Sequence, residues 1–149
     1  MRAISTRRLP LFLLLLVLVL DLNACGLFPG SRSKDEYTVN GRTYHLLHSA
    51  KGYRKVGVAS YYADRLHGRK TASGERFNKN AMTCAHTILP FRTKLRVTNL
   101  QNKRTVIVRV NDRGPFKRNR LIDLSPAAAK KLGFIQKGSA KVLVEYVPD

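Results

Sequence analysis

The sequence predicts a single, mainly β domain that closes into a small barrel. About six short segments alternate apolar with polar residues or are rich in β-branched residues, and turn residues bound each of them. The connections are too short for the helical crossovers of a parallel α/β sheet, and closure removes the exposed edges of short strands. The expected strands are Val56–Tyr62, Ala81–Thr87, Lys94–Asn99, Arg104–Val110, Arg120–Leu124 and Ala140–Val147.

The clearest local signals are a hairpin and a capped helix. Lys94–Asn99 alternates strictly, a polar turn follows, and Arg104–Val110 continues as the second strand. Residues 125–133 are typical of one short helix, with a serine N-cap, a proline at the first helical position and a terminal glycine. Ala63–Lys79 is long and charged, so we expect it to form a loop over the surface of the barrel.

The N-terminus has the parts of a lipoprotein leader. Arginines open the chain, Leu11–Leu20 is an unbroken apolar run, and Leu22-Asn23-Ala24-Cys25 resembles a lipobox. The apolar run is too short to span a bilayer as a helix of the mature protein. We expect a leader at residues 1–24 and lipidation of Cys25. The alternative is an ordinary leader, with Cys25 in a disulfide.

Two further regions follow the leader. Residues 25–54 are expected to hold a Gly-, Pro- and Ser-containing tether and a short hairpin that turns at Asn40-Gly41. Residues 55–149 form the expected barrel domain. Gly26, rather than an aspartate, follows the lipidation site, which favours an outer-membrane lipoprotein that faces the periplasm of a Gram-negative bacterium.

The charge indicates an anionic partner. The chain has 28 Lys and Arg against 9 Asp and Glu, a formal net charge of +19. Loss of three arginines and Asp21 with the leader leaves +17, so the charge belongs to the mature domain. Export excludes nucleic acid as the expected partner and leaves the membrane and the cell-wall polymer.

No cofactor or metal is expected. The histidines lack a tight ligand spacing, and no nucleotide fingerprint is present. If Cys25 is lipidated, Cys84 is left without a disulfide partner. Its apolar neighbours favour a small buried residue over a nucleophile.

Three stretches of the sequence resemble the rare lipoprotein A (RlpA) family, in the order in which that family has them. They are Gly57–Tyr62 with His67–Phe77, Met82–Phe91, and Val97–Leu100 with Val108–Phe116 and Arg120–Ser125. The resemblance covers about residues 56–147. It implies a six-stranded double-psi β-barrel with one short helix, and a lytic transglycosylase that acts on peptidoglycan glycan strands stripped of stem peptides. The C-terminal peptidoglycan-binding repeat (SPOR) of many members is not found here, and a monomer is expected.

The resemblance points to three catalytic candidates. Glu75 matches the family's catalytic Glu and His86 its functional His, whereas Asp112 is the alternative acid. A lytic transglycosylase can use one carboxyl group as acid and then as base, provided that its pKa is raised in a partly desolvated site. The alternatives are an exposed Glu75 paired with Arg69 or Arg76, a structural His86, and an Asp112 that caps a turn. Asp123 is interpreted as structural.

One position departs from the family. Many members have an aspartate where this chain has Asn78, and an amide transfers no proton at neutral pH. The function that competes with a transglycosylase is therefore a wall-binding lipoprotein that has lost turnover. A third hypothesis is a basic protein that only bridges membrane and polymer. The residues expected to bind substrate are Asn78, Tyr62, Arg69, Ser73 and Arg113.

Overall fold

The computed structural model describes residues 35–148. The predicted leader, Cys25 and the start of the tether lie outside the described residues. Within residues 35–148, no helix is long and apolar enough to cross a membrane.

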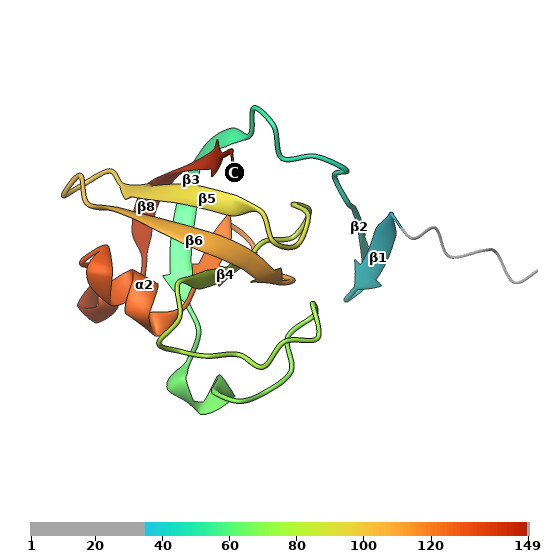
Figure 1. Ribbon diagram of the computed structural model, residues 1–149, viewed down its shortest axis with the longest axis horizontal. Helices are drawn as coiled ribbons and strands as arrows, with labels where there is room; N and C mark the ends of the chain where they lie inside the picture. The colour runs from blue at the N-terminus through green and yellow to red at the C-terminus, as the bar shows by residue number, and fades with distance from the viewer. Residues whose placement is uncertain (1–34, 149) are drawn as a thin grey trace, which may run out of the picture. The chain divides into compact units, whose positions relative to one another are not determined.

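The predicted closed barrel is confirmed. Its six strands close in the order β3-β7-β4-β6-β5-β8, with α2 at one side (Figure 1). β3 runs parallel to β7 and β4 parallel to β6, while the remaining neighbours are antiparallel. The strands are β3 (Arg54–Tyr61), β4 (Thr83–Ala85), β5 (Lys94–Asn99), β6 (Thr105–Asp112), β7 (Ile122–Leu124) and β8 (Ala140–Val147).

Alternating aliphatic side chains fill the barrel. On β5, β6 and β8 every second residue is buried, which is the pattern of strands with one face toward a core. Phe134 and Leu132, beyond the end of the helix, are fully buried and belong to the same cluster. The buried Val, Leu and Ile residues of the barrel strands are Leu95, Val97, Val106, Val108, Val110, Ile122, Leu124, Val142 and Val144.

The predicted helix is present, and two predicted strands are shorter than expected. α2 (Pro126–Lys131) begins at Ser125, whose Oγ accepts a hydrogen bond from the amide of Ala128 at 3.2 Å. β4 and β7 have three residues each, because the chain leaves the barrel for turns on both sides of them. The expected loop 63–79 contains a short 3₁₀ turn, η1 (Asp64–Leu66), and a second turn, η2 (Ile135–Lys137), follows α2.

A hairpin precedes the barrel and contacts it. β1 (Glu36–Val39) pairs with β2 (Arg42–His45), and the turn between them has positive φ at Asn40 and Gly41. The hydroxyl of Tyr37 donates to the carbonyl of Thr87 at 2.7 Å. The expected hairpin is therefore present and makes a defined contact with the turn that follows β4.

The register of the strands creates a polar row on the outside of the barrel. Ser60 of β3 pairs with Asp123 of β7, Asp123 pairs with Ala85 of β4, and Ala85 pairs with Asp112 of β6. Paired residues share a face, and the residues that flank Ser60, Ala85 and Asp123 include the core residues Ala59, Cys84, Ile122 and Leu124. We call this outer side of β3, β7, β4 and β6 the carboxylate face.

Candidate active site

A β-bulge on β6 gathers polar side chains at one end of the carboxylate face. The pairing of β4 with β6 shifts register after Cys84, so β6 has one extra residue there. Val110 stays in the core, whereas the side chains of Arg109, Asn111 and Asp112 all bond to groups of loop 63–80 or to Tyr62. Simple alternation would have sent one of these polar side chains inward, and the bulge prevents this.

The carboxylate of Glu75 is held by two residues of β6. Arg109 donates to both of its oxygens, at 2.6 and 2.8 Å, and the amide of Asn111 donates at 3.2 Å. These hydrogen bonds, above all those from Arg109, lower the pKa of Glu75 to about 2. Glu75 is therefore ionised at neutral pH, opposite to the raised pKa expected for a group that first acts as an acid. Arg76, which the sequence offered as an alternative partner of Glu75, donates instead to the carbonyl of Gly68 at 3.0 Å.

Asp112 fastens loop 63–80 to the barrel. Its Oδ1 accepts from the amides of Ala72 and Arg113, each at 2.8 Å, and its Oδ2 accepts from the hydroxyl of Tyr62 at 2.7 Å. The amide of Ser73 adds a bond of 3.2 Å to the carbonyl of Asn111. Asp112, Tyr62 and Ser73 thus form one network around the loop that carries Glu75.

Asp123 is a second carboxyl group on the same face. Its side chain is 16% exposed, and the guanidinium of Arg120 lies 3.5 Å from its Oδ1. That oxygen is buried and accepts no hydrogen bond within the described part of the chain. Burial raises the pKa of Asp123, which favours the protonated form. The alternation of Ile122, Asp123 and Leu124 is the sequence signal for this outward position, although the sequence alone suggested a structural role.

His86 lies in a buried turn rather than beside Glu75. It is 1% exposed, its Nδ1 accepts from the amides of Ile88 and Leu89 at 3.3 and 3.2 Å, and its Nε2 lies 2.9 Å from the hydroxyl of Tyr53. Since Nδ1 is an acceptor, the ring proton is on Nε2. Burial lowers the pKa of His86 to about 4, so the ring is neutral at neutral pH.

Arg113 supports the same turn. Its guanidinium donates to the carbonyls of His86 and Leu89 at 3.2 and 2.7 Å and stacks over the ring of Phe91 at 3.8 Å. The backbone links this turn to the carboxylate face, because the amide of His86 donates to the carbonyl of Asp112.

The remaining candidates are exposed on the loop. The side-chain oxygen of Asn78 accepts from the amide of Asn80 at 2.9 Å, which closes a local turn. Arg69 is exposed, and its backbone pairs with Phe77 and Leu66. Within residues 35–148, no hydrogen bond or ion pair joins the side chain of either residue to Glu75, Asp112 or Asp123.

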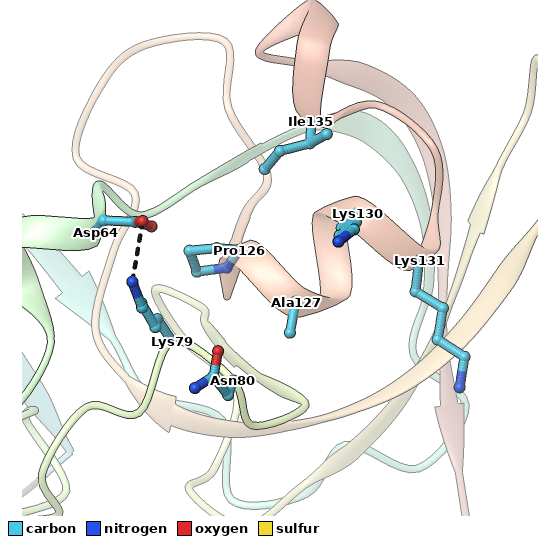
Figure 2. A pocket seen from close by; sticks show the side chains of 8 residues that line it. All are labelled: Asp64, Lys79, Asn80, Pro126, Ala127, Lys130, Lys131 and Ile135. Carbon is cyan, nitrogen blue, oxygen red and sulfur yellow. Dashed lines mark hydrogen bonds and ion pairs between the residues drawn. The ribbon is translucent and has the colours of Figure 1, made fainter.

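A pocket of about 650 Å³ lies beside α2 and does not include the three carboxylates of the site. Figure 2 shows Lys79 in an ion pair with Asp64, at 3.1 Å, and Lys130 and Lys131 on the helix. We call this the helix pocket. Within the described range, no three His, Cys, Asp or Glu side chains form a cluster that could hold a metal ion.

Comparisons with known proteins identify the family and the fold of this chain. A family model described as lytic transglycolase matches residues 54–144. The chain is 53% identical over 118 residues to the endolytic peptidoglycan transglycosylase RlpA of Pseudomonas aeruginosa, a match that covers 79% of this chain and 35% of that protein. It is 51% identical over 111 residues to the RlpA of Campylobacter jejuni, covering 74% of this chain and 40% of the other. The chain therefore spans only about a third to two fifths of the length of these relatives.

Solved structures share the fold. A Streptomyces papain inhibitor has a TM-score of 0.52 and 25% identity, over 65% of this chain and 96% of the other. A mutant expansin of Clavibacter michiganensis in complex with cellohexaose has a TM-score of 0.53 and 21% identity, over 65% and 52%. The second likeness concerns the fold alone. Since the family model matches more than half of the sequence, this chain belongs to the lytic transglycolase family and has its double-psi β-barrel fold.

Proposed function

We propose that this chain is a lytic transglycosylase that cleaves peptidoglycan glycan strands and leaves anhydromuramyl ends. The observation that carries the proposal is the fixed carboxylate of Glu75, held by Arg109 and Asn111 at the edge of a face that carries two more carboxyl groups. The similarity to proteins named endolytic peptidoglycan transglycosylases supports the same reaction.

The reaction requires two proton transfers, one to the oxygen of the leaving sugar and one away from the attacking hydroxyl. The C6 hydroxyl of a muramyl residue attacks its own anomeric carbon, the glycosidic bond breaks, and the leaving oxygen takes up a proton. The hydroxyl proton goes to a base, so the reaction consumes no water. Because Glu75 is ionised, it suits the stabilisation of positive charge at the anomeric carbon, and it can act as the base once Arg109 releases it.

The acid is then a different group. Asp112 already accepts three hydrogen bonds and acts as a positioning residue for the loop. Burial raises the pKa of Asp123 above that of an ordinary aspartate against the opposing charge of Arg120, 3.5 Å from its Oδ1, and that oxygen accepts no hydrogen bond in the described part of the chain. We therefore assign the acid to Asp123 and the base to Glu75. His86 and Arg113 keep the neighbouring turn in place.

Asn78 is compatible with turnover. Its side chain closes a local turn and makes no described bond to Glu75, so the missing carboxyl group leaves the Glu75 network intact. The competing hypothesis, a wall-binding protein without turnover, requires that a carboxyl group at this position takes part in the chemistry.

Digestion of sacculi tests both hypotheses. Purified chain is incubated with intact and with amidase-treated sacculi, and anhydromuramyl products are counted by mass spectrometry. We expect products from the wild type and from Asn78→Asp, and a loss of at least about a hundredfold in Glu75→Gln, the scale of general acid–base catalysis. Asp123→Asn should lose a similar factor, whereas loss in Glu75→Gln alone would remove Asp123 from the mechanism. Products from Asn78→Asp but not from the wild type would favour the binding protein.

We also propose that Cys25 carries lipid and holds the barrel at the outer membrane. The lipobox-like sequence and the tether after it support this location. Labelling of cells with a radioactive fatty acid should mark the wild type and leave Cys25→Ser unlabelled, with Cys84→Ser as the matched control that keeps its label. Equal labelling of wild type and Cys25→Ser would contradict the anchor.

A further inference from the structure

A second pocket, of about 360 Å³, lies between the hairpin β1–β2 and residues 115–121. We call it the basic pocket. Five cationic side chains line it, together with the rings of Tyr44 and Phe116, and no carboxylate is among its lining residues. The cations are Arg42, Lys55, Lys117, Arg118 and Arg120.

Most of this positive charge is not neutralised by the protein. Arg120 lies near Asp123, but the other four cations take part in none of the ion pairs described within residues 35–148. Arg42 lies over the ring of Tyr44, 5.4 Å from its centroid. Several like charges around one small pocket repel one another, and a bound anion would relieve that repulsion.

The basic pocket adjoins the carboxylate face. Arg120 and Leu121 directly precede β7, which carries Asp123, and Thr87 directly follows His86. The charge of Lys117 lowers the pKa of Asp123, and that of Lys55 lowers the pKa of His86. An extended ligand that crosses the carboxylate face would therefore reach the pocket.

The rings restrict the kind of anion. Phe116 is 41% exposed although it is a large apolar side chain, and Tyr37 and Tyr44 support its ring at centroid distances of 6.3 and 5.7 Å. Exposed aromatic faces suit the C–H face of a sugar ring, and guanidinium groups suit a planar carboxylate. The pocket combines both features, which fits an acidic sugar better than an inorganic ion.

We propose that the basic pocket is a subsite for the free lactyl carboxylate of a muramyl residue, next to the sugar that is cleaved on the carboxylate face. The inference rests on the proposed function for the identity of the polymer. The pocket thereby distinguishes a muramyl residue that carries no stem peptide, because amide formation removes the charge that the cations would bind.

Binding measurements on the full chain test the subsite separately from cleavage. Every protein carries Glu75→Gln, so that no strand is cut. Calorimetry then compares peptide-free muramyl glycan, the same glycan with its carboxylates converted to amides, and chitohexaose, which lacks them. At 0.15 M salt we expect the amidated glycan and chitohexaose to bind at least about tenfold more weakly, the scale of one lost charged hydrogen bond.

A pair of variants with equal charge locates the effect. Lys117→Gln/Arg118→Gln should weaken binding of the peptide-free glycan about tenfold and abolish its preference over the amidated form. The matched control is Lys130→Gln/Lys131→Gln, which removes two charges from the helix pocket and should change affinity less than about twofold. Equal thermal unfolding midpoints of the two variants confirm that both are folded.

Three outcomes would overturn the subsite. They are equal loss in both variants, which indicates a diffuse charge effect, equal affinity for free and amidated glycan, and tighter binding of isolated stem peptide than of peptide-free glycan. Selective binding by the Glu75→Gln protein would support the subsite even if the wild type released no anhydromuramyl product. The subsite and the proposed reaction can therefore fail independently.

Discussion

His86 makes the stability of the barrel depend on pH. In the folded chain its pKa is about 4, whereas an unperturbed histidine has 6.5. Between these values the unfolded chain binds a proton at this ring and the folded chain does not, so acid favours unfolding. The structure explains the lowered pKa in two ways. A proton on Nδ1 would remove the acceptor of the hydrogen bonds from the amides of Ile88 and Leu89, and it would place a charge on a residue that is only 1% exposed.

The magnitude follows from the width of this window. At about 1.4 kcal/mol per pH unit, the ring costs the folded state about 3 kcal/mol as the pH falls from 6.5 to 4. The loss is complete near pH 4, because below it both states are protonated. A domain of this size has about 5–15 kcal/mol of stability, so the effect is a large fraction of the total.

Urea unfolding between pH 7.5 and 4 measures the effect, with wild type and His86→Asn compared at each pH. The His86→Asn protein is less stable than the wild type at pH 7.5 because it leaves a small cavity, but the side-chain oxygen of asparagine can still accept hydrogen bonds from the two amides. The gap between the two proteins should therefore shrink by about 3 kcal/mol as the pH falls. A constant gap, or a His86 ring that titrates near pH 6.5 by NMR, would refute the reasoning.

Three further predictions concern other parts of the structure. Arg109→Met should raise the pKa of Glu75 from about 2 toward 4.5, measured by ¹³C NMR of the carboxyl group, and an unchanged titration would show that the ion pair does not set it. Gly57→Ala should destabilise the barrel by about 1–3 kcal/mol, measured by urea unfolding, because the new methyl group would lie 2.6 Å from Cβ of Leu121. Unchanged stability would show that Leu121 can move away without cost. Burial raises the pKa of the Cys84 thiol, so dithionitrobenzoate should modify it only after unfolding, and modification of the folded chain would contradict its burial.

The fold was predictable wherever the two faces of a strand differ. β5 and β6 alternate between core and solvent, so composition alone locates them, and Ser125 and Gly133 mark the helix. β4 was less predictable because all three of its residues are buried. No local pattern in the sequence indicated the order of the strands, because the parallel partners β3 and β7 are some sixty residues apart and pair only when the barrel closes.

The site was predictable as a set of residues but not as an arrangement. The resemblance identified Glu75, yet its partner Arg109 is 34 positions away on β6 and becomes a neighbour only when loop 63–80 folds onto that strand. His86 and Arg113 were predicted to take part in catalysis and in substrate binding, and in the structure their side chains bond to backbone groups of the turn that follows β4. Their sequence context could not reveal this, because a polar residue at a strand end looks the same whether it faces substrate or satisfies buried backbone groups.

The arrangement changes how the departure at Asn78 should be interpreted. If Glu75 had to supply the proton, its ion pair with Arg109 would have to break first, and a nearby carboxylate would help by raising its pKa. A base must also be released by Arg109, but it needs no neighbouring carboxylate to help it hold a proton, because it starts ionised. An amide at position 78 then costs the reaction little, provided that a separate group such as Asp123 gives the proton. Under the proposed assignment, the pair of carboxyl groups with opposite pKa shifts makes turnover compatible with Asn78.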